Sequence, residues 1–222
     1  MSNIEPIRLA SFVDAFGAGS GTGLSGMGRR ERRAAQTRVK LFRRALQLIA
    51  KRGFPNVTVE DITEAADVGK GTFFNYFETK DHVLGVMAEI QLGKVREAAS
   101  LAVEGKKSIY SVLHWLVLRL VEEPGRSPSV ARAMISSFLA SKAVRGIIDR
   151  NMLAGRKEIA EIVAAGQARG EINRRLKKTK IAIQLQQMMM GTVLLWSLHG
   201  EPELKAWLED SFQHFWKAIA SG

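Results

Sequence analysis

Helical periodicity is the feature that most limits what this chain can fold into. From Arg29 almost to the C-terminus, apolar residues recur every three to four positions, and no segment alternates over several residues as a β-strand does. Glycine and proline mark breaks in this pattern, as at Gly53 with Pro55 and at Gly200 with Pro202. We therefore expect an all-α protein with helices at about 29–52, 59–66, 70–76, 80–103, 107–123, 128–141, 144–168, 178–198 and 203–219.

The net charge narrows the class of partner. The 222 residues include 33 Lys and Arg against 22 Asp and Glu, which gives a formal charge of +11. Such an excess favours a polyanion, which is DNA, RNA or an anionic membrane surface. Residues 29–80 hold twelve basic and six acidic side chains, so +6 of this charge lies in under a quarter of the chain.

Composition and spacing also disfavour several kinds of site. The chain has no cysteine, which excludes disulfides, thiolate metal sites and cysteine nucleophiles. Its histidines never have the spacing of metal ligands on one helix, and the sequence has no Ser-His-Asp arrangement or paired-carboxylate motif. No continuous apolar run reaches about 18 residues, and the N-terminus does not resemble a secretory signal. We expect a cytoplasmic protein that is not an enzyme and has no cofactor, metal or membrane partner.

Two short helices joined by a tight turn stand out at residues 58–77. Thr58 is placed to cap the first, Asp67-Val68-Gly69 forms the turn, and the second reads KGTFFNYF. This second helix suits a major groove, because Lys70 supplies charge for phosphate, Gly71 lets the backbone come close and Thr72 can meet a base edge. Three phenylalanines of this segment cannot all face DNA, so at least one must anchor the helix to a small core.

These residues carry a family resemblance. The stretch from about 37 to 90 resembles the DNA-binding domain of the TetR family of bacterial repressors, most specifically in GKGTFFNYF followed by TK. The resemblance implies a homodimer that binds a palindromic operator in double-stranded DNA and is released by a small-molecule effector of unknown identity. Carried over by position, the residues expected to contact DNA are Lys70, Gly71, Thr72, Phe73, Asn75, Tyr76 and Lys80, while Thr58, Val59 and Glu60 would open the supporting helix at the DNA backbone.

The sequence departs from the family pattern at two positions. Phe74 stands where tyrosine is frequent, so a hydroxyl for phosphate is missing. Asp67 stands where glycine is usual in the turn. Aspartate tolerates a left-handed backbone conformation, so we expect the turn to survive.

A basic cluster precedes the first helix pattern. Arg29, Arg30, Arg32 and Arg33 follow a glycine-rich tract at 17–28, which we interpret as a flexible linker. We expect these arginines to form an arm that enters a minor groove; the alternative is a solvated helix start. The formal GxGxxG match at 21–26 lacks a preceding strand and is interpreted as linker. A second basic run from Arg169 to Lys180 is interpreted as a solvated linker and helix start.

The last two helix patterns are more apolar than one core contact requires. Such a surplus predicts a helix–helix dimer interface, and the resemblance implies the same region through a four-helix bundle made by two subunits. The expected interface residues are Leu185, Met188, Thr192, Leu195, Leu204, Leu208, Phe212 and Phe215.

The middle helices are expected to enclose an effector pocket. Its candidate lining residues are Trp115, Met134, Phe138, Met189 and Trp196, each of which would serve equally well in an ordinary core. Arg119 lies in an apolar stretch and would pair with an acidic effector, or else with nearby Glu122 or Glu123.

We divide the chain into a flexible extension at 1–28, a helix-turn-helix domain at 29–80, and an effector-binding and dimerisation domain at 81–222. The expected function is that of a ligand-released repressor. The alternative is a DNA-binding regulator without an effector, controlled by its concentration or by a protein partner.

Overall fold

The computed structural model describes residues 28–201 and 203–221. The expected extension and its glycine tract, apart from Gly28, lie outside this range. The described part contains helices and one isolated antiparallel bridge, between Ile172 and Ala220, which confirms the all-α expectation. The elements are α2 Arg29–Arg52, η1 Phe54–Asn56, α3 Val59–Ala65, α4 Lys70–Phe74, α5 Lys80–Glu104, α6 Ile109–Leu120, η2 Pro124–Arg126, α7 Pro128–Ala140, α8 Lys142–Ala168, α9 Lys178–His199 and α10 Leu204–Ile219.

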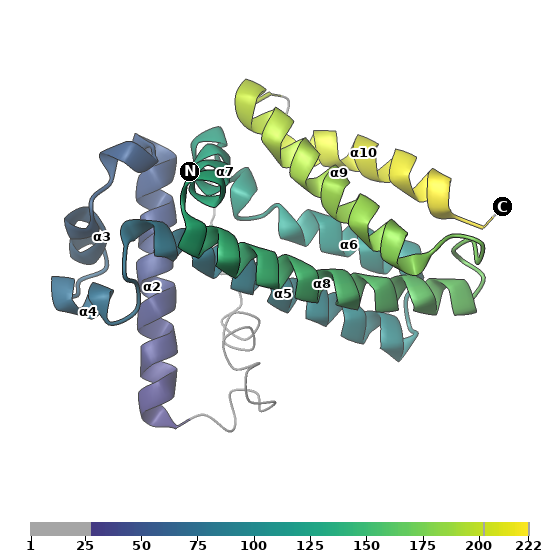
Figure 1. The fold of residues 1–222 in the computed structure, drawn as a ribbon, viewed down its shortest axis with the longest axis horizontal. Helices are drawn as coiled ribbons and strands as arrows, with labels where there is room; N and C mark the ends of the chain where they lie inside the picture. Colours follow the sequence, from purple (N-terminus) through teal and green to yellow (C-terminus); the bar gives the residue numbers. More distant parts are fainter. Residues whose placement is uncertain (1–27, 202, 222) are drawn as a thin grey trace.

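Helices α2, α3 and α4 form one end of the molecule (Figure 1). The apolar stripe of α2 is buried against the two short helices, with Phe42, Ile62 and Phe73 fully enclosed in one core. Gly53 ends α2 in a conformation with φ of 75°, which a residue with a side chain rarely adopts. Arg38 then ties α2 to α5 through two hydrogen bonds to Glu89, at 2.8 and 2.9 Å.

The remaining helices form a longer body in which α5 and α8 run side by side and α9 and α10 lie together (Figure 1). Leu113, Leu116, Val163 and Phe212 are fully buried in its core. The turn after α8 packs closely because Gly166 has no side chain: a Cβ there would lie 2.8 Å from the Cδ1 of Ile172.

The two cores meet along α5 and α7. Val83 and Val86 of α5, together with Val130 and Ala133 of α7, are buried in the same core as α2. The beginning of α5 therefore supports the short helices. Residues after position 80 share a core with α2, α3 and α4.

Helix α9 meets the length and hydropathy expected of a membrane-spanning helix, although no such segment was expected from the sequence. It is the one described helix that is long and apolar enough to cross a membrane, with 22 residues and a mean hydropathy of 1.3 over its most apolar stretch. The expectation considered only unbroken apolar runs, and polar residues such as Gln186 and Thr192 interrupt this one. In the structure α9 packs against α7, α8 and α10, as the core helix of a folded protein does.

Candidate DNA-binding surface and effector pocket

Helix α3 begins with the cap that the sequence predicts. The hydroxyl of Thr58 accepts from the backbone N–H of Asp61 at 3.0 Å, and Asp61 accepts in return from the N–H and the hydroxyl of Thr58, both at 2.8 Å. Arg52 at the end of α2 adds a hydrogen bond of 2.9 Å to the same carboxylate. The Thr58 N–H, the Thr58 hydroxyl and Arg52 together lower the pKa of Asp61 below its usual value.

The turn between α3 and α4 is built as expected around Asp67. Its φ of 50° makes it the one described residue other than glycine with a positive φ. The N–H of Asp67 donates to Glu64 O and that of Val68 to Thr63 O, both at 3.0 Å. These bonds close the C-terminal end of α3 before α4 begins.

Helix α4 has a buried side and an exposed side. Phe73 is fully buried and Phe77 is 2% exposed, and their ring centroids lie 5.2 Å apart. The expectation that Phe73 contacts DNA is therefore wrong, because positions 73 and 77 are four residues apart and both face the α2 core. Phe74 is 48% exposed, so the side chain that replaces the frequent tyrosine does face outward.

The other residues expected on the reading face are accessible. Lys70, Gly71 and Asn75 are exposed, and Thr72 and Tyr76 are half-buried. A Cβ added at Gly71 would meet no atom within 4 Å, so packing within the described chain does not require glycine there. The open space at Gly71 leaves room for another molecule to approach the α4 backbone closely.

Two residues expected to meet the DNA backbone are paired with each other. The Lys70 ammonium of α4 donates to the Glu60 carboxylate of α3, and both side chains are more than half exposed. This hydrogen bond is the largest cause that lowers the pKa of Glu60. Thr58 is exposed and Val59 half-buried at the same end of α3. An exposed ion pair is weak, so a phosphate can replace Glu60 as the partner of Lys70.

Lys80 has a role that sequence reasoning missed. Its ammonium donates to the carbonyls of Phe54 at 2.9 Å and Val57 at 2.7 Å, and lies 4.2 Å from the centre of the Phe54 ring. It thus holds the start of α5 onto η1, and one of its three N–H donors is left for a phosphate. The sequence holds one signal for this role, the aromatic residue Phe54 of η1, but it lies 26 residues before Lys80.

The arginine cluster is helical rather than an extended arm. All four arginines are exposed in the first turns of α2, while Glu31 accepts a hydrogen bond of 2.9 Å from the N–H of Gly28. Contact of this cluster with DNA stays a prediction.

In the second basic run, Arg174 donates to the carbonyls of Gln167 and Ala168, and Lys178 pairs with Glu161 at 2.8 Å. The run joins α8 to α9, which begins at Lys178, so these contacts agree with its interpretation as a linker and helix start.

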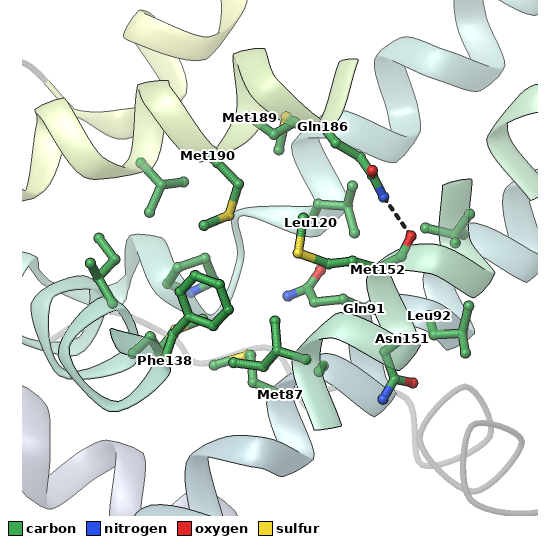
Figure 2. A pocket seen from close by; sticks show the side chains of 18 of the residues that line it. Met87, Gln91, Leu92, Leu120, Phe138, Asn151, Met152, Gln186, Met189 and Met190 are labelled. Atoms are coloured by element: carbon green, nitrogen blue, oxygen red, sulfur yellow. Dashed lines mark hydrogen bonds between the residues drawn. The ribbon is translucent and has the colours of Figure 1, made fainter. Parts of the chain in front are cut away.

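A cavity of about 190 Å³ lies among α5, α7, α8 and α9 (Figure 2). Met134, Phe138 and Met189 line it, as the sequence predicts. Trp115, Arg119 and Trp196 do not line this cavity. Trp196 is only 4% exposed in the core, and Arg119 pairs with Glu122 at 2.5 Å above the ring of Trp115. The apolar pattern could not show which large side chains face the cavity.

A buried ion pair behind the cavity was not predicted. The ammonium of Lys94, on α5, lies 2.6 and 2.9 Å from the two carboxylate oxygens of Glu123. Their side chains are 4% and 0% exposed. Gln91, one turn before Lys94, donates to Glu123 at 3.1 Å and also lines the cavity. A lysine within an apolar helix pattern was the available signal.

The expected dimer interface is wrong at five positions. Leu185, Thr192, Leu204, Leu208 and Phe212 are buried within a single chain because their stripes face its own core.

Three expected interface residues remain accessible. Met188 and Phe215 are half-buried, and Leu195 is half exposed. Sequence reasoning missed Leu194 and Leu198, which are 42% and 63% exposed on α9.

Comparisons with known proteins agree with this arrangement. Residues 41–87 match the family model described as bacterial regulatory proteins, tetR family. The chain is 42% identical over 59 residues to the HTH-type transcriptional regulator TcmR of Streptomyces glaucescens, which covers 27% of this chain and 26% of TcmR. It is 24% identical over 159 residues to the HTH-type transcriptional repressor DhaR of Mycobacterium sp. strain GP1, covering 71% of this chain and 80% of DhaR.

A solved structure extends the likeness beyond the first four helices. The chain is similar to Thermus thermophilus FadR, a TetR-family transcriptional repressor in complex with lauroyl-CoA, with 26% identity and a TM-score of 0.59. The likeness covers 80% of this chain and 92% of FadR. These relatives are transcriptional regulators rather than enzymes.

Proposed function

We propose that the chain is a TetR-family repressor that binds a palindromic operator as a homodimer and leaves it when a small molecule fills the cavity; the match of residues 41–87 to the family and the likeness to DhaR and to Thermus thermophilus FadR support this. The observation that carries the proposal is the outward face of α4, where accessible polar side chains surround the open space at Gly71. The helix itself is held firmly, because Phe73 and Phe77 are buried beneath it.

On this face we assign two kinds of DNA contact. Lys70 binds phosphate, because a lysine ammonium is a compact charge without base-reading geometry. Thr72 and Asn75 read base edges, since a hydroxyl, a methyl and an amide can each recognise a base in the major groove. The exposed arginines at the start of α2 supply further contacts with the sugar–phosphate backbone.

A second copy of the chain is the proposed partner of the exposed side of α9. Leu194, Leu195 and Leu198 lie on it with large exposed fractions, and a Cβ at Gly191 would meet no atom within 4 Å. A small residue among exposed leucines lets another helix approach closely. Such a dimer must hold the two copies of α4 roughly 34 Å apart, because successive major grooves require that spacing.

The test of the dimer is the oligomeric state of a surface variant. Leu195→Glu and Leu198→Glu together should shift the sedimentation coefficient from dimer to monomer, because two charges would be buried at the interface. Leu139→Glu is the matched control, since Leu139 is 64% exposed on α7. An unchanged dimer in the double variant, or dissociation in the control as well, contradicts this assignment.

Residues shared by the cavity and the core around α2 support release of the DNA by an effector. Leu84, Met87 and Met134 line the cavity and also pack in or against the core that holds α2. A ligand that displaces them changes the support of α3 and α4. If the ligand binds this displaced geometry better than the DNA-binding one, the population shifts and the operator is released.

The function is tested by the affinity for an operator selected from random DNA, measured by fluorescence anisotropy. Lys70→Ala should weaken binding to every sequence and lower the slope against salt by about one ion. Thr72→Ala should instead change the preference among related sequences. Lys217→Ala, an exposed lysine on α10, is the control of equal charge. A Lys70→Ala protein that behaves like this control would contradict the proposal.

A further inference from the structure

The lining of the cavity is uncharged. The described residues around it include no Asp, Glu, Lys, Arg or His, and their polar side chains are Gln91, Asn151 and Gln186. Five of the eight methionines of the chain lie in the lining, where their flexible side chains adapt to the shape of an apolar ligand. A charged group placed among them would lose its hydration without gaining a partner.

Of the polar atoms of these three side chains, one is buried and has no hydrogen-bond partner among the described residues. Gln186 donates to Met152 O at 2.8 Å (Figure 2) and accepts from Arg156 at 3.0 Å. Asn151 donates to Ile147 O at 2.8 Å. The Oε1 atom of Gln91 is buried and accepts no hydrogen bond from the described residues.

The orientation of the Gln91 amide follows from the ion pair behind it. Glu123 is fully buried and holds the ammonium of Lys94 on both of its oxygens. An ionised carboxylate only accepts hydrogen bonds, so Gln91 must turn its NH₂ group toward Glu123. The carbonyl oxygen of the amide then has no donor within the described part of the chain, and Figure 2 shows Gln91 among the side chains that surround the cavity.

We infer that the effector is a neutral, mainly apolar molecule with one hydroxyl or N–H group, and that this group donates to Oε1 of Gln91. The inference rests on the proposed function, since it specifies the ligand of the same cavity. The apolar body of the ligand packs against Met87, Phe138 and Met189. This oxygen has almost no accessible surface, so flexible methionine side chains of the lining must shift for the ligand's donor to reach it. Binding then satisfies a buried acceptor that has no donor among the described residues, which makes the donor a requirement for tight binding.

The size of the cavity sets the scale of the probe. An engineered apolar cavity of about 150 Å³ takes up benzene, so 190 Å³ suits a somewhat larger molecule. Met190 lines the cavity and is 41% exposed, so the cavity reaches the surface there and an alkyl group can extend past it. Suitable probes are 4-butylphenol, 4-butylanisole and 4-butylbenzoate, which share a butylphenyl group. The phenol can donate a hydrogen bond, the anisole can only accept one, and the benzoate is an anion.

The experiment measures the affinity of the full chain for each probe by isothermal titration calorimetry at neutral pH. We expect 4-butylphenol to bind about tenfold more tightly than 4-butylanisole, which is the effect of one buried hydrogen bond, and 4-butylbenzoate to bind most weakly. Gln91→Met should remove the preference for the phenol and keep the affinity for the anisole. Gln186→Met is the control and should keep the preference, because the amide of Gln186 is already used on both sides.

Several results would overturn the inference. Equal affinity of the native chain for 4-butylphenol and 4-butylanisole would show that the hydroxyl of the phenol makes no favourable hydrogen bond in the cavity. This result does not depend on the stability of the Gln91→Met variant. Tightest binding by the benzoate, or tighter binding by lauroyl-CoA that Gln91→Met does not weaken, would show that the ligand is charged. Absence of binding by all probes also overturns it. If the same preparation still binds the operator, the proposed function as a DNA-binding regulator is retained and only this class of ligand is excluded.

Discussion

The buried pair of Lys94 and Glu123 offers a sharp test of how the longer body of helices is held together. Lys94→Met removes an ammonium that also donates to Arg119 O at 2.5 Å, and leaves Glu123 buried with Gln91 as its remaining side-chain donor. Breaking a buried ion pair in this way costs about 3–5 kcal/mol of unfolding free energy. For a chain of this length, that corresponds to a fall in Tm of roughly 6–20 °C.

The double variant Lys94→Met/Glu123→Leu separates charge from packing. Removing both charges leaves no isolated carboxylate, so its unfolding free energy should recover to within about 1–2 kcal/mol of the native value. Both are measured by urea unfolding followed by circular dichroism. Lys106→Met, which loses only an exposed pair with Glu104, is the control and should change stability by under about 1 kcal/mol. A single variant as stable as this control, or a double variant worse than the single one, would refute the reasoning.

Two further predictions concern the short helices. Thr58→Ala should lower the unfolding free energy by about 1 kcal/mol in urea titrations, because the cap of α3 is lost. The lowered pKa of Asp61 adds stability that is fully present above the pKa of the unfolded chain, about 4, and is lost as the pH falls through the pKa of the folded chain. Asp61→Asn should remove this acid dependence. Phe73→Ala should cost about 3–5 kcal/mol and abolish operator binding, whereas Phe74→Ala should leave stability almost unchanged, and equal losses in the two would contradict the assignment of faces.

Local signals made the helix-turn-helix predictable. The cap at Thr58, the turn at Asp67 and the break at Gly53 each depend on residues within a few positions of one another, so the sequence contains all that decides them. The succession of helices follows from apolar spacing in the same way. The face of α4 was harder, because Phe73 and Phe74 are chemically identical and only the packing against α2 distinguishes them.

Contacts between distant segments were not predictable from one sequence. From the sequence, Lys80 is assigned to DNA and Lys94 has no assigned role. The partners of Lys80 are backbone carbonyls, and those of Lys94 are a carbonyl and a carboxylate, all more than twenty residues away. The dimer prediction failed at Leu208 and Phe212 for a related reason. An apolar stripe shows that a helix face is covered, but it does not show whether the same chain or a second copy covers it.

The central claim, that two copies of α4 bind one operator, is tested most directly by a hydroxyl-radical footprint of the full chain on its selected DNA site. We predict two protected segments related by two-fold symmetry, with centres about 10–10.5 base pairs apart or a multiple of that spacing. A single protected segment without a symmetry mate, or no protection at all, would contradict it.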